Sequence, residues 1–254
     1  MSQPALSIII PAYQEAARIS LTLIRLSAFL KKHAYDDTEV LVVVANGTDE
    51  TATLAAAKAG LFSKFRVVYA GPRAGKGRDV RTGIMEARGR FKLFMDADLA
   101  TPLHHLHTVQ GLIKDNPEVV IGVRDLHASH TGLRKWLSNV GNRVVRLVLL
   151  PGITDSQCGF KLFRSDVAAE LFGRQRILGW GFDMELLTIA RQRNYRINTI
   201  AIHDWHDQPD GTFERTMGPA MFQTLGELIV IIWHRSTGAY RNKRFVYQRY
   251  EPNR

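Results

Sequence analysis

The sequence predicts an α/β protein whose central sheet is mostly parallel and covered by helices on both faces. Short apolar runs of strand length alternate with longer segments of helical spacing, as in repeated strand–helix units. The runs are apolar at successive positions, which indicates strands buried on both faces. The expected strands are residues 6–10, 39–44, 65–70, 91–95 and 118–123.

The first helix is expected between the first two strands. Its apolar side chains recur at intervals of three and four residues, the spacing of one helix face. They are Ala16, Ile19, Leu23, Leu26 and Leu30. Lys31 and Lys32 follow, where the helix dipole favours cations.

Polar and glycine-rich segments follow four of the expected strands. They read "PAYQEA", "ANGTDET", "GPRAGKGRDVRTG" and "DADLATP". Ligands of parallel sheets bind beyond the carboxyl ends of the strands. The sequence therefore predicts a ligand site at that edge of the sheet. We expect one domain, residues 1–221, followed by a C-terminal helix and basic tail, residues 222–254.

The whole chain is basic, with 34 Lys and Arg against 24 Asp and Glu and a formal net charge of +10. This balance favours phosphorylated metabolites, nucleic acid or an anionic membrane surface as partners. Cys158, the single cysteine, excludes an internal disulfide, fits a reducing cytoplasm and is interpreted as a packed residue. No export signal is expected, and the apolar stretch 228–233 is far shorter than the roughly 20 residues that cross a bilayer.

The glycine-rich segment is neither of the two common nucleotide-binding loops. Gly77 follows Lys76 where a Walker loop has Ser or Thr, and Val80 occupies the third glycine position of GxGxxG. The segment still carries a cationic set suited to phosphate: Arg73, Lys76, Arg78 and Arg81. The alternative is a solvated basic loop.

Asp96 and Asp98 follow the fourth expected strand one residue apart. Side chains at such positions of a strand lie on one face, so both carboxylates can reach one cation. Oxygen ligands completed by substrate phosphates are typical of Mg²⁺ and Mn²⁺. The alternative is an acidic surface turn.

Five motifs, in their order and spacing, make the chain resemble the inverting glycosyltransferases of family 2. They are "IIIPAYQEAARI", "GKGRDVRTGIMEARG", "FMDADLATP", "GVR" and "TDSQCGFKLF". The resemblance covers roughly residues 5–200 and implies the GT-A fold, a nucleotide-sugar donor and Mg²⁺ or Mn²⁺. Residues 155–163 and 179–187 are most similar to the dolichyl-phosphate β-glucosyltransferases and next to the dolichyl-phosphate mannose synthases.

The resemblance also implies residue roles. It places Pro11, Ala12, Tyr13 and Glu15 in the nucleotide pocket, with Asp96 and Asp98 holding the cation and diphosphate. From the residues themselves we add Asn46, Lys76 and Arg81 to the expected substrate-binding set. The positions that bind donor and acceptor phosphates in polyprenyl-phosphate sugar transferases are Arg124, Arg134 and Ser138. Asp155 and Gln157 would face the reacting sugar, in a second half that begins near Arg124 and builds the acceptor side. The alternative to phosphate binding by Arg124 and Arg134 is that both form surface salt bridges.

Two departures from the family pattern concern the donor. Relatives usually carry Asp-Asp-Gly-Ser after the second strand, where this chain has residues 45–48, "ANGT". Asn46 both donates and accepts, which leaves the choice of uracil or guanine open. Ala100 replaces a polar residue that some relatives offer the metal, so water or another residue is expected there.

The expected reaction moves a hexose from a nucleotide sugar, UDP-glucose first and GDP-mannose next, to polyprenyl or dolichyl phosphate. A lipid phosphate is already ionised at neutral pH, with a second pKa of about 6, so no strong general base is needed. For a hydroxyl acceptor, Asp155 and Asp183 are the base candidates. The nearer alternative is a soluble family 2 transferase acting on a sugar or small phosphorylated acceptor.

A non-catalytic nucleic-acid or phosphate-binding module is the remote alternative. Such modules gather basic residues on a stripe with exposed aromatics, whereas here the basic residues lie beside carboxylates at strand ends. We therefore expect no nucleic-acid partner.

The C-terminal segment, residues 222–250, is typical of an interfacial helix with a basic tail. We expect it to contact the membrane, which implies a cytoplasmic protein held peripherally at the inner face. The alternatives are a helix packed on the core and a homodimer contact, each with a solvated tail.

Two histidine-rich segments look like metal clusters. In "PLHHLH" Pro102 is expected to begin a helix around which His104, His105 and His107 spread, which argues against a shared ion. In "HDWHD" either His203 or His206 could approach the donor from a late loop.

Overall fold

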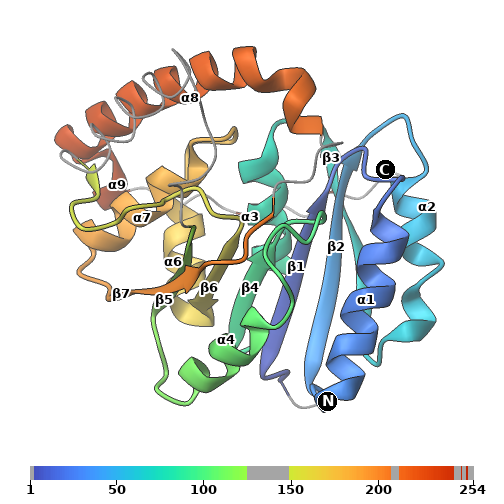
Figure 1. The fold of residues 1–254 in the computed structure, drawn as a ribbon. Coiled ribbons are helices and arrows are strands. Elements are labelled where there is room, and N and C mark those ends of the chain that lie inside the picture. Colours follow the sequence, from blue (N-terminus) through green and yellow to red (C-terminus); the bar gives the residue numbers. More distant parts are fainter. Residues whose placement is uncertain (1–2, 125–148, 207–211, 243–246, 248–249, 251–254) are drawn as a thin grey trace.

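A computed structural model describes residues 3–124, 149–206, 212–242, 247 and 250 (Figure 1), with the backbone alone for residues 212–222 and 242. The first half of the chain contains β1 (Leu6–Ala12), α1 (Ile19–Lys32), β2 (Thr38–Asn46), α2 (Thr51–Ala56), the 3-10 turn η1 (Ala59–Leu61), β3 (Phe65–Pro72), α3 (Lys76–Glu86), β4 (Phe91–Met95), α4 (His105–Ile113) and β5 (Val119–Arg124). The second half contains β6 (Phe160–Arg164), α6 (Ser165–Arg174), α7 (Phe182–Gln192), β7 (Ile197–Ile202), α8 (Thr212–Ser236) and α9 (Ala239–Asn242).

Within the described residues, seven strands form one sheet in the order β3-β2-β1-β4-β6-β5-β7. The pairs β1–β2, β2–β3, β1–β4 and β5–β7 are parallel, whereas β6 runs antiparallel to both β4 and β5. All five strands expected from the sequence lie in this sheet, which confirms the mostly parallel α/β fold. The apolar runs do not predict β6 and β7.

Helices cover both faces of the sheet because alternate strand residues point to opposite sides. On one face, strand residues such as Ile8 and Val42 pack with the apolar side chains of α1, α2 and α4. On the other face, Ile9 and Val43 pack with those of α3, α6, α7 and α8. The strand ends are therefore fixed between two packed layers, and the loops beyond them are held in place.

The structure corrects two expected helix starts and the interpretation of the glycine-rich segment as a loop. α1 begins at Ile19, so Ala16 precedes it. α3 begins at Lys76, directly after Gly75 (φ 123°), so much of the glycine-rich segment is helix rather than flexible loop. α4 begins at His105 and not at Pro102, which instead accepts a hydrogen bond from the His105 amide in a preceding turn.

Helix α8 runs along the top of Figure 1, the side of the sheet on which β1 and β2 end. Leu228 and Ile231 of α8 are buried against the layer that contains α7. On its other side, Ile229, Val230 and Trp233 are exposed. Among the described residues, no helix is both long enough and apolar enough to pass through a bilayer.

Candidate active site

Two carboxylates and a lysine meet where β4 ends. Asp96 and Asp98 follow the last residue of β4, and Lys76 is the first residue of α3. The Lys76 Nζ lies 2.6 Å from Asp96 Oδ1. The Asp98 Oδ1 accepts a hydrogen bond of 2.9 Å from the Ala100 amide, which closes the loop after the strand. The structure thus assembles the acidic pair predicted from the sequence beside Lys76, one of the cations of the glycine-rich segment.

Gly159, just before β6, leaves the space that the Asp96 side chain occupies. The Asp96 amide donates a hydrogen bond of 3.1 Å to the Gly159 carbonyl, because β4 and β6 are neighbours in the sheet. A Cβ atom on Gly159 would overlap the Asp96 carboxylate. The position of Asp96 therefore depends on a residue without a side chain.

Four carboxylates gather around this cluster, and Lys76 and Arg18 balance only part of their negative charge. Burial, followed by the charge of Asp96, raises the pKa of Asp98. Burial also raises the pKa of Glu15 to about 7; Arg18 opposes this rise, and Asp98, Asp96 and Asp49 add to it. Hard oxygen donors in a partly buried anionic site are what Mg²⁺ and Mn²⁺ require, and a bound cation would relieve the repulsion. These residues fit the divalent cation that the fold family implies.

The end of β2, the loop after it, α2 and one residue of β3 line a cavity of about 330 Å³. It is lined by Val44, Ala45, Asn46, Gly47, Asp49, Ala52 and Tyr69. Asp49 joins the loop after β2 to the loop after β1, since its carboxylate accepts hydrogen bonds from the Ala16 amide (3.2 Å) and from the Thr51 hydroxyl (2.8 Å). Asn46, predicted to read the base, is exposed in this cavity.

The remaining predicted nucleotide residues lie around the end of β1. Pro11 and Ala12 are the last residues of that strand, where Ala12 is buried. The Tyr13 ring lies under a basic side chain, with the guanidinium carbon of Arg73 3.5 Å from the ring centroid. An aromatic face thus helps to position Arg73.

Arg124 and Asp155 form a two-pronged ion pair at the end of β5. Arg124 Nε lies 2.6 Å from Asp155 Oδ2, and Arg124 Nη2 lies 3.1 Å from Asp155 Oδ1. Although burial opposes it, this pairing lowers the pKa of Asp155 and raises that of Arg124. Asp155 also accepts a hydrogen bond of 3.0 Å from the amide of Gln157, whose side chain is exposed. The guanidinium carbon of Arg124 lies 5.0 Å from the centroid of the Trp205 ring.

The structure places two predicted site residues in buried positions. Arg81 lies inside α3 because that helix starts at Lys76, and its Nη1 donates a hydrogen bond of 3.3 Å to the Gln175 carbonyl. Asp183 is 4% exposed in α7 and lies 2.7 Å from the Nζ of the fully buried Lys161. Both side chains therefore face the protein interior, and each contributes to the packing beneath the site.

Cys158 is fully buried, as predicted for a packed residue. Burial raises the pKa of its thiol to about 11, so the thiolate is not available near neutral pH. Two other predicted residues, Arg134 and Ser138, lie outside the described residues.

Sequence reasoning missed a contact between α8 and the site. The loop "GWG", residues 179–181, lies over Lys76, whose Nζ is 5.5 Å from the centroid of the Trp180 ring. The carboxylate of Glu227 in α8 accepts a hydrogen bond of 2.6 Å from the Gly181 amide. Gly179 and Gly181, on either side of Trp180, were the signal in the sequence for a close contact at this loop. A Cβ atom on Gly179 would overlap the Glu227 side chain.

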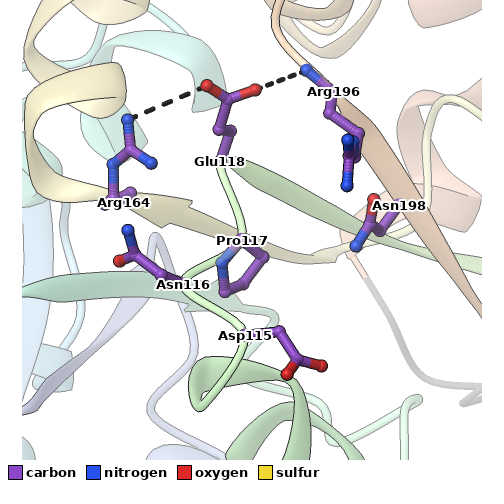
Figure 2. A pocket seen from close by; sticks show the side chains of 7 residues that line it. All are labelled: Asp115, Asn116, Pro117, Glu118, Arg164, Arg196 and Asn198. Carbon is purple, nitrogen blue, oxygen red and sulfur yellow. Dashed lines mark hydrogen bonds and ion pairs between the residues drawn. The ribbon is translucent and has the colours of Figure 1, made fainter.

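A larger cavity, of about 480 Å³, lies at the opposite edge of the sheet. Figure 2 shows that Glu118 bridges its two sides: Glu118 accepts a hydrogen bond of 2.6 Å from the Arg196 amide and lies 3.8 Å from Arg164. This cavity precedes the first residues of β5 and β7, whereas ligands of parallel sheets bind beyond the last ones. We therefore assign the site to the smaller, carboxyl-end cavity and the adjoining carboxylates.

Solved structures share this architecture. Glucosyl-3-phosphoglycerate synthase from Mycobacterium tuberculosis, in complex with Mn²⁺, UDP and phosphoglyceric acid, matches with a TM-score of 0.67 and 19% identity over 90% of this chain and 78% of that one. Mannosyl-3-phosphoglycerate synthase from Rubrobacter xylanophilus matches with a TM-score of 0.70 and 14% identity over 98% and 78% of the two chains. These likenesses confirm the GT-A fold.

Among curated proteins, a dolichyl-phosphate beta-glucosyltransferase of Trichomonas vaginalis is 32% identical over 81% of this chain and 67% of its own length, and a second one from that organism matches over 64% of its length. The dolichyl-phosphate beta-glucosyltransferase of Saccharomyces cerevisiae is 29% identical over 94% of this chain and 77% of its own length. The model of the family "Glycosyl transferase family 2" matches residues 7–172, more than half of the 254 residues. With the acidic pair at the end of β4, these matches show that the chain belongs to glycosyl transferase family 2.

Proposed function

We propose that the protein moves a hexose from a nucleotide sugar to a polyprenyl or dolichyl phosphate, with UDP-glucose as the favoured donor and GDP-mannose next. The observation that carries this proposal is the arrangement of two groups at one sheet edge. The Asp96–Asp98 pair suits a cation on a leaving diphosphate, and Arg124 adds a guanidinium that suits an incoming phosphate. Relatives named dolichyl-phosphate beta-glucosyltransferase support the choice of sugar and acceptor.

The chemistry of the site favours an acceptor that is already ionised. A bound divalent cation would supply charge neutralisation for the nucleoside diphosphate as it leaves. The two base candidates each face a cation partner: Asp155 faces Arg124, and Asp183 faces Lys161. Although burial opposes it, the ion pair lowers the pKa of Asp155 and so weakens it as a base, whereas burial raises the pKa of Asp183, whose side chain is enclosed in the protein and paired with Lys161. A phosphate oxyanion needs no base and is therefore a more suitable nucleophile than a hydroxyl group.

The exposed face of α8 supports a membrane location for this reaction. Ile229, Val230 and Trp233 are 70%, 39% and 60% exposed and lie within two turns of one helix face. Arg235 follows them in the last turn, and the chain has a net charge of +10. An apolar stripe with basic residues suits the surface of a bilayer containing anionic lipids. We propose a cytoplasmic protein bound peripherally at the inner face of the membrane.

The transfer itself is tested with purified full-length protein, radiolabelled UDP-glucose, GDP-mannose or UDP-N-acetylglucosamine, polyprenyl phosphate and Mg²⁺ or Mn²⁺. Label extracted into organic solvent from one donor would support the proposal. Asp96→Asn and Asp98→Asn should abolish the cation-dependent transfer while the protein stays folded, because each change removes a charged ligand without changing volume. Asp36→Asn, at an exposed position, is the matched control.

Label found only in water-soluble product would favour the second candidate, a family 2 transferase with a small phosphorylated acceptor. The solved glucosyl-3-phosphoglycerate synthase, in complex with UDP and phosphoglyceric acid, has the same fold and supports keeping this candidate. Full turnover of both aspartate variants would contradict the cation assignment in either case.

Membrane binding is tested separately by sedimentation with vesicles containing anionic lipid. Ile229→Ser should weaken binding about tenfold, since a buried isoleucine contributes roughly 1.5 kcal/mol or more. Ile24→Ser is the matched control, because Ile24 is 46% exposed on α1. A dimer that Ile229→Ser disrupts, without vesicle binding, would instead assign this face to a homodimer.

A further inference from the structure

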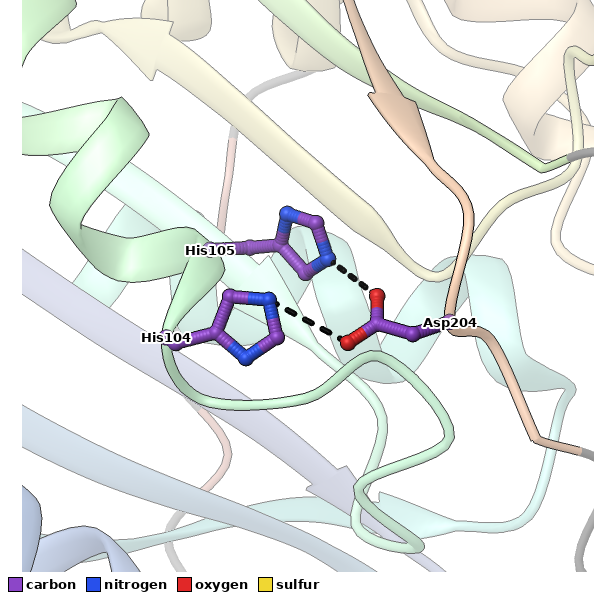
Figure 3. Close-up of side chains that lie close together, drawn as sticks. All are labelled: His104, His105 and Asp204. Carbon is purple, nitrogen blue, oxygen red and sulfur yellow. Dashed lines mark hydrogen bonds and ion pairs between the residues drawn. The ribbon is translucent and has the colours of Figure 1, made fainter.

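Two histidines and an aspartate converge on one point outside the acidic pair. His104 precedes α4, His105 is its first residue, and Asp204 follows the end of β7 by two residues. Figure 3 shows both imidazole rings directed toward the Asp204 carboxylate. His104 Nε2 lies 3.2 Å from Asp204 Oδ2, and His105 Nε2 lies 2.7 Å from Asp204 Oδ1. One ligand atom from each of the three residues fits within a 4.8 Å span.

From this geometry we propose that His104, His105 and Asp204 form a second metal site, selective for Zn²⁺ and similar transition-metal ions over Mg²⁺. Tetrahedral zinc with bonds of about 2.0 Å separates its ligand atoms by about 3.3 Å. The two histidine nitrogens lie beside different oxygens of Asp204, 3.2 Å from Oδ2 and 2.7 Å from Oδ1, and one ligand atom from each of the three residues lies within 4.8 Å of the others. Rotation of the exposed side chains would bring these atoms to zinc spacing. Solvent would complete the coordination, because His104 is 58% exposed.

The ligand types distinguish this site from the acidic pair. Imidazole nitrogen suits zinc and its neighbours, whereas Mg²⁺ takes oxygen ligands and keeps water. His105 is 8% exposed, which fixes its ring and reduces the entropy lost on binding.

The segment that follows the proposed site contacts both halves of the active site. Trp205 lies beside the Arg124 guanidinium, and the His206 amide donates a hydrogen bond of 3.1 Å to the carbonyl of Ala100 in the loop after Asp98. An ion held by His104, His105 and Asp204 would fix residues 203–206 against the start of α4. We therefore expect the metal to stabilise the loop that supports Arg124.

The experiment uses full-length, metal-stripped protein with Asp96→Asn as background, so that the acidic pair does not contribute. Co²⁺ is added as a spectroscopic probe and then displaced by Zn²⁺ in excess Mg²⁺. We expect a visible absorption band of tetrahedral Co²⁺ that Zn²⁺ removes and Mg²⁺ does not, and a rise in Tm with Zn²⁺. Asp204→Asn and His104→Ala should weaken Co²⁺ binding at least tenfold. His104→Ala is the decisive variant, since an exposed side chain can be removed without unfolding the protein.

His107→Ala is the matched control, because it removes a histidine from the same helix and its ring packs on Phe29 and His33 instead. This control should bind Co²⁺ like the background protein. Equal Co²⁺ affinity in the His104→Ala protein, or a Co²⁺ band absent from the Asp96→Asn background but present in the parent, would overturn the proposal. Neither outcome depends on the transfer reaction, so the proposed function is tested independently.

Discussion

Replacing Gly159 by alanine tests the link between the sheet and the acidic pair. Gly159 has no unusual backbone angle, so alanine is accepted by the main chain itself. Its Cβ would overlap the Asp96 carboxylate and lie 2.9 Å from Oδ1. Because the β4–β6 pairing ends at the adjacent pair, Met95 and Phe160, and the Asp96 amide is bonded to the Gly159 carbonyl, the backbone cannot separate easily, and the Asp96 side chain must move.

The size of this movement sets the expected loss. Ordinary van der Waals contact requires a shift of the carboxylate on the order of 1 Å, and a displacement of that size in an active site costs roughly 100-fold in rate. This corresponds to about 2.7 kcal/mol of transition-state stabilisation. The Lys76–Asp96 ion pair of 2.6 Å would be lost at the same time. Crowding in a packed region should also lower the free energy of unfolding by about 1–3 kcal/mol.

The assay measures cation-dependent binding of nucleoside diphosphate, turnover and unfolding by denaturant in the same preparations. Gly111→Ala is the control, because a Cβ there has no atom within 4 Å. It should leave binding unchanged and stabilise α4 by up to about 1 kcal/mol. A folded Gly159→Ala protein whose cation-dependent binding stays within about twofold of the parent would refute the reasoning.

Three further predictions concern the surroundings of the acidic pair. Because the pKa of Glu15 is raised from 4.5 to about 7, its contribution to stability is complete below about pH 4.5 and is lost as the pH rises through 7. The free energy of unfolding should fall by up to roughly 3 kcal/mol over this range. In Glu15→Gln the dependence of this free energy on pH should be absent, and an unchanged dependence would contradict the assignment. Glu227→Gln should cost about 1 kcal/mol and raise the KM for the donor, because the charged acceptor for the Gly181 amide is gone; donor kinetics unaffected by the change would separate α8 from the site. Arg124→Lys should reduce kcat/KM about tenfold or more in a transfer assay, since lysine cannot reproduce the two-pronged contact with Asp155; full activity would remove the guanidinium from the mechanism.

The first half of the fold follows closely from local sequence patterns. The run at residues 39–44 is apolar on both faces because β2 lies inside the sheet, between β1 and β3. β7 is an edge strand with partly exposed side chains, and its sequence "INTIAI" has no comparable apolar run. β6 contains Lys161, a charged residue that normally argues against a buried strand. Its partner Asp183 comes from α7, and no local sequence pattern predicts that these two residues pair.

The same division applies to the candidate site. Asp96 and Asp98 are predictable because their geometry follows from one strand and the two residues after it. The assignment of Arg81 to phosphate depends on where α3 begins, and a start at Lys76 places it on a packed face. The meeting of His104 with Asp204 joins the start of α4 to the end of β7, and it requires the order of strands in the sheet.

The reversed direction of β6 brings its start to the edge of the sheet at which β5 ends. β5 leaves the sheet at Arg124, and β6 enters it at Phe160 from the same edge, because the two strands are antiparallel. The described ends of the connection between them, Arg124 and Asp155, therefore meet at the site and are joined by their ion pair. Chimaeras that exchange residues 125–154 between relatives would test whether this connection selects the acceptor while the donor stays the same.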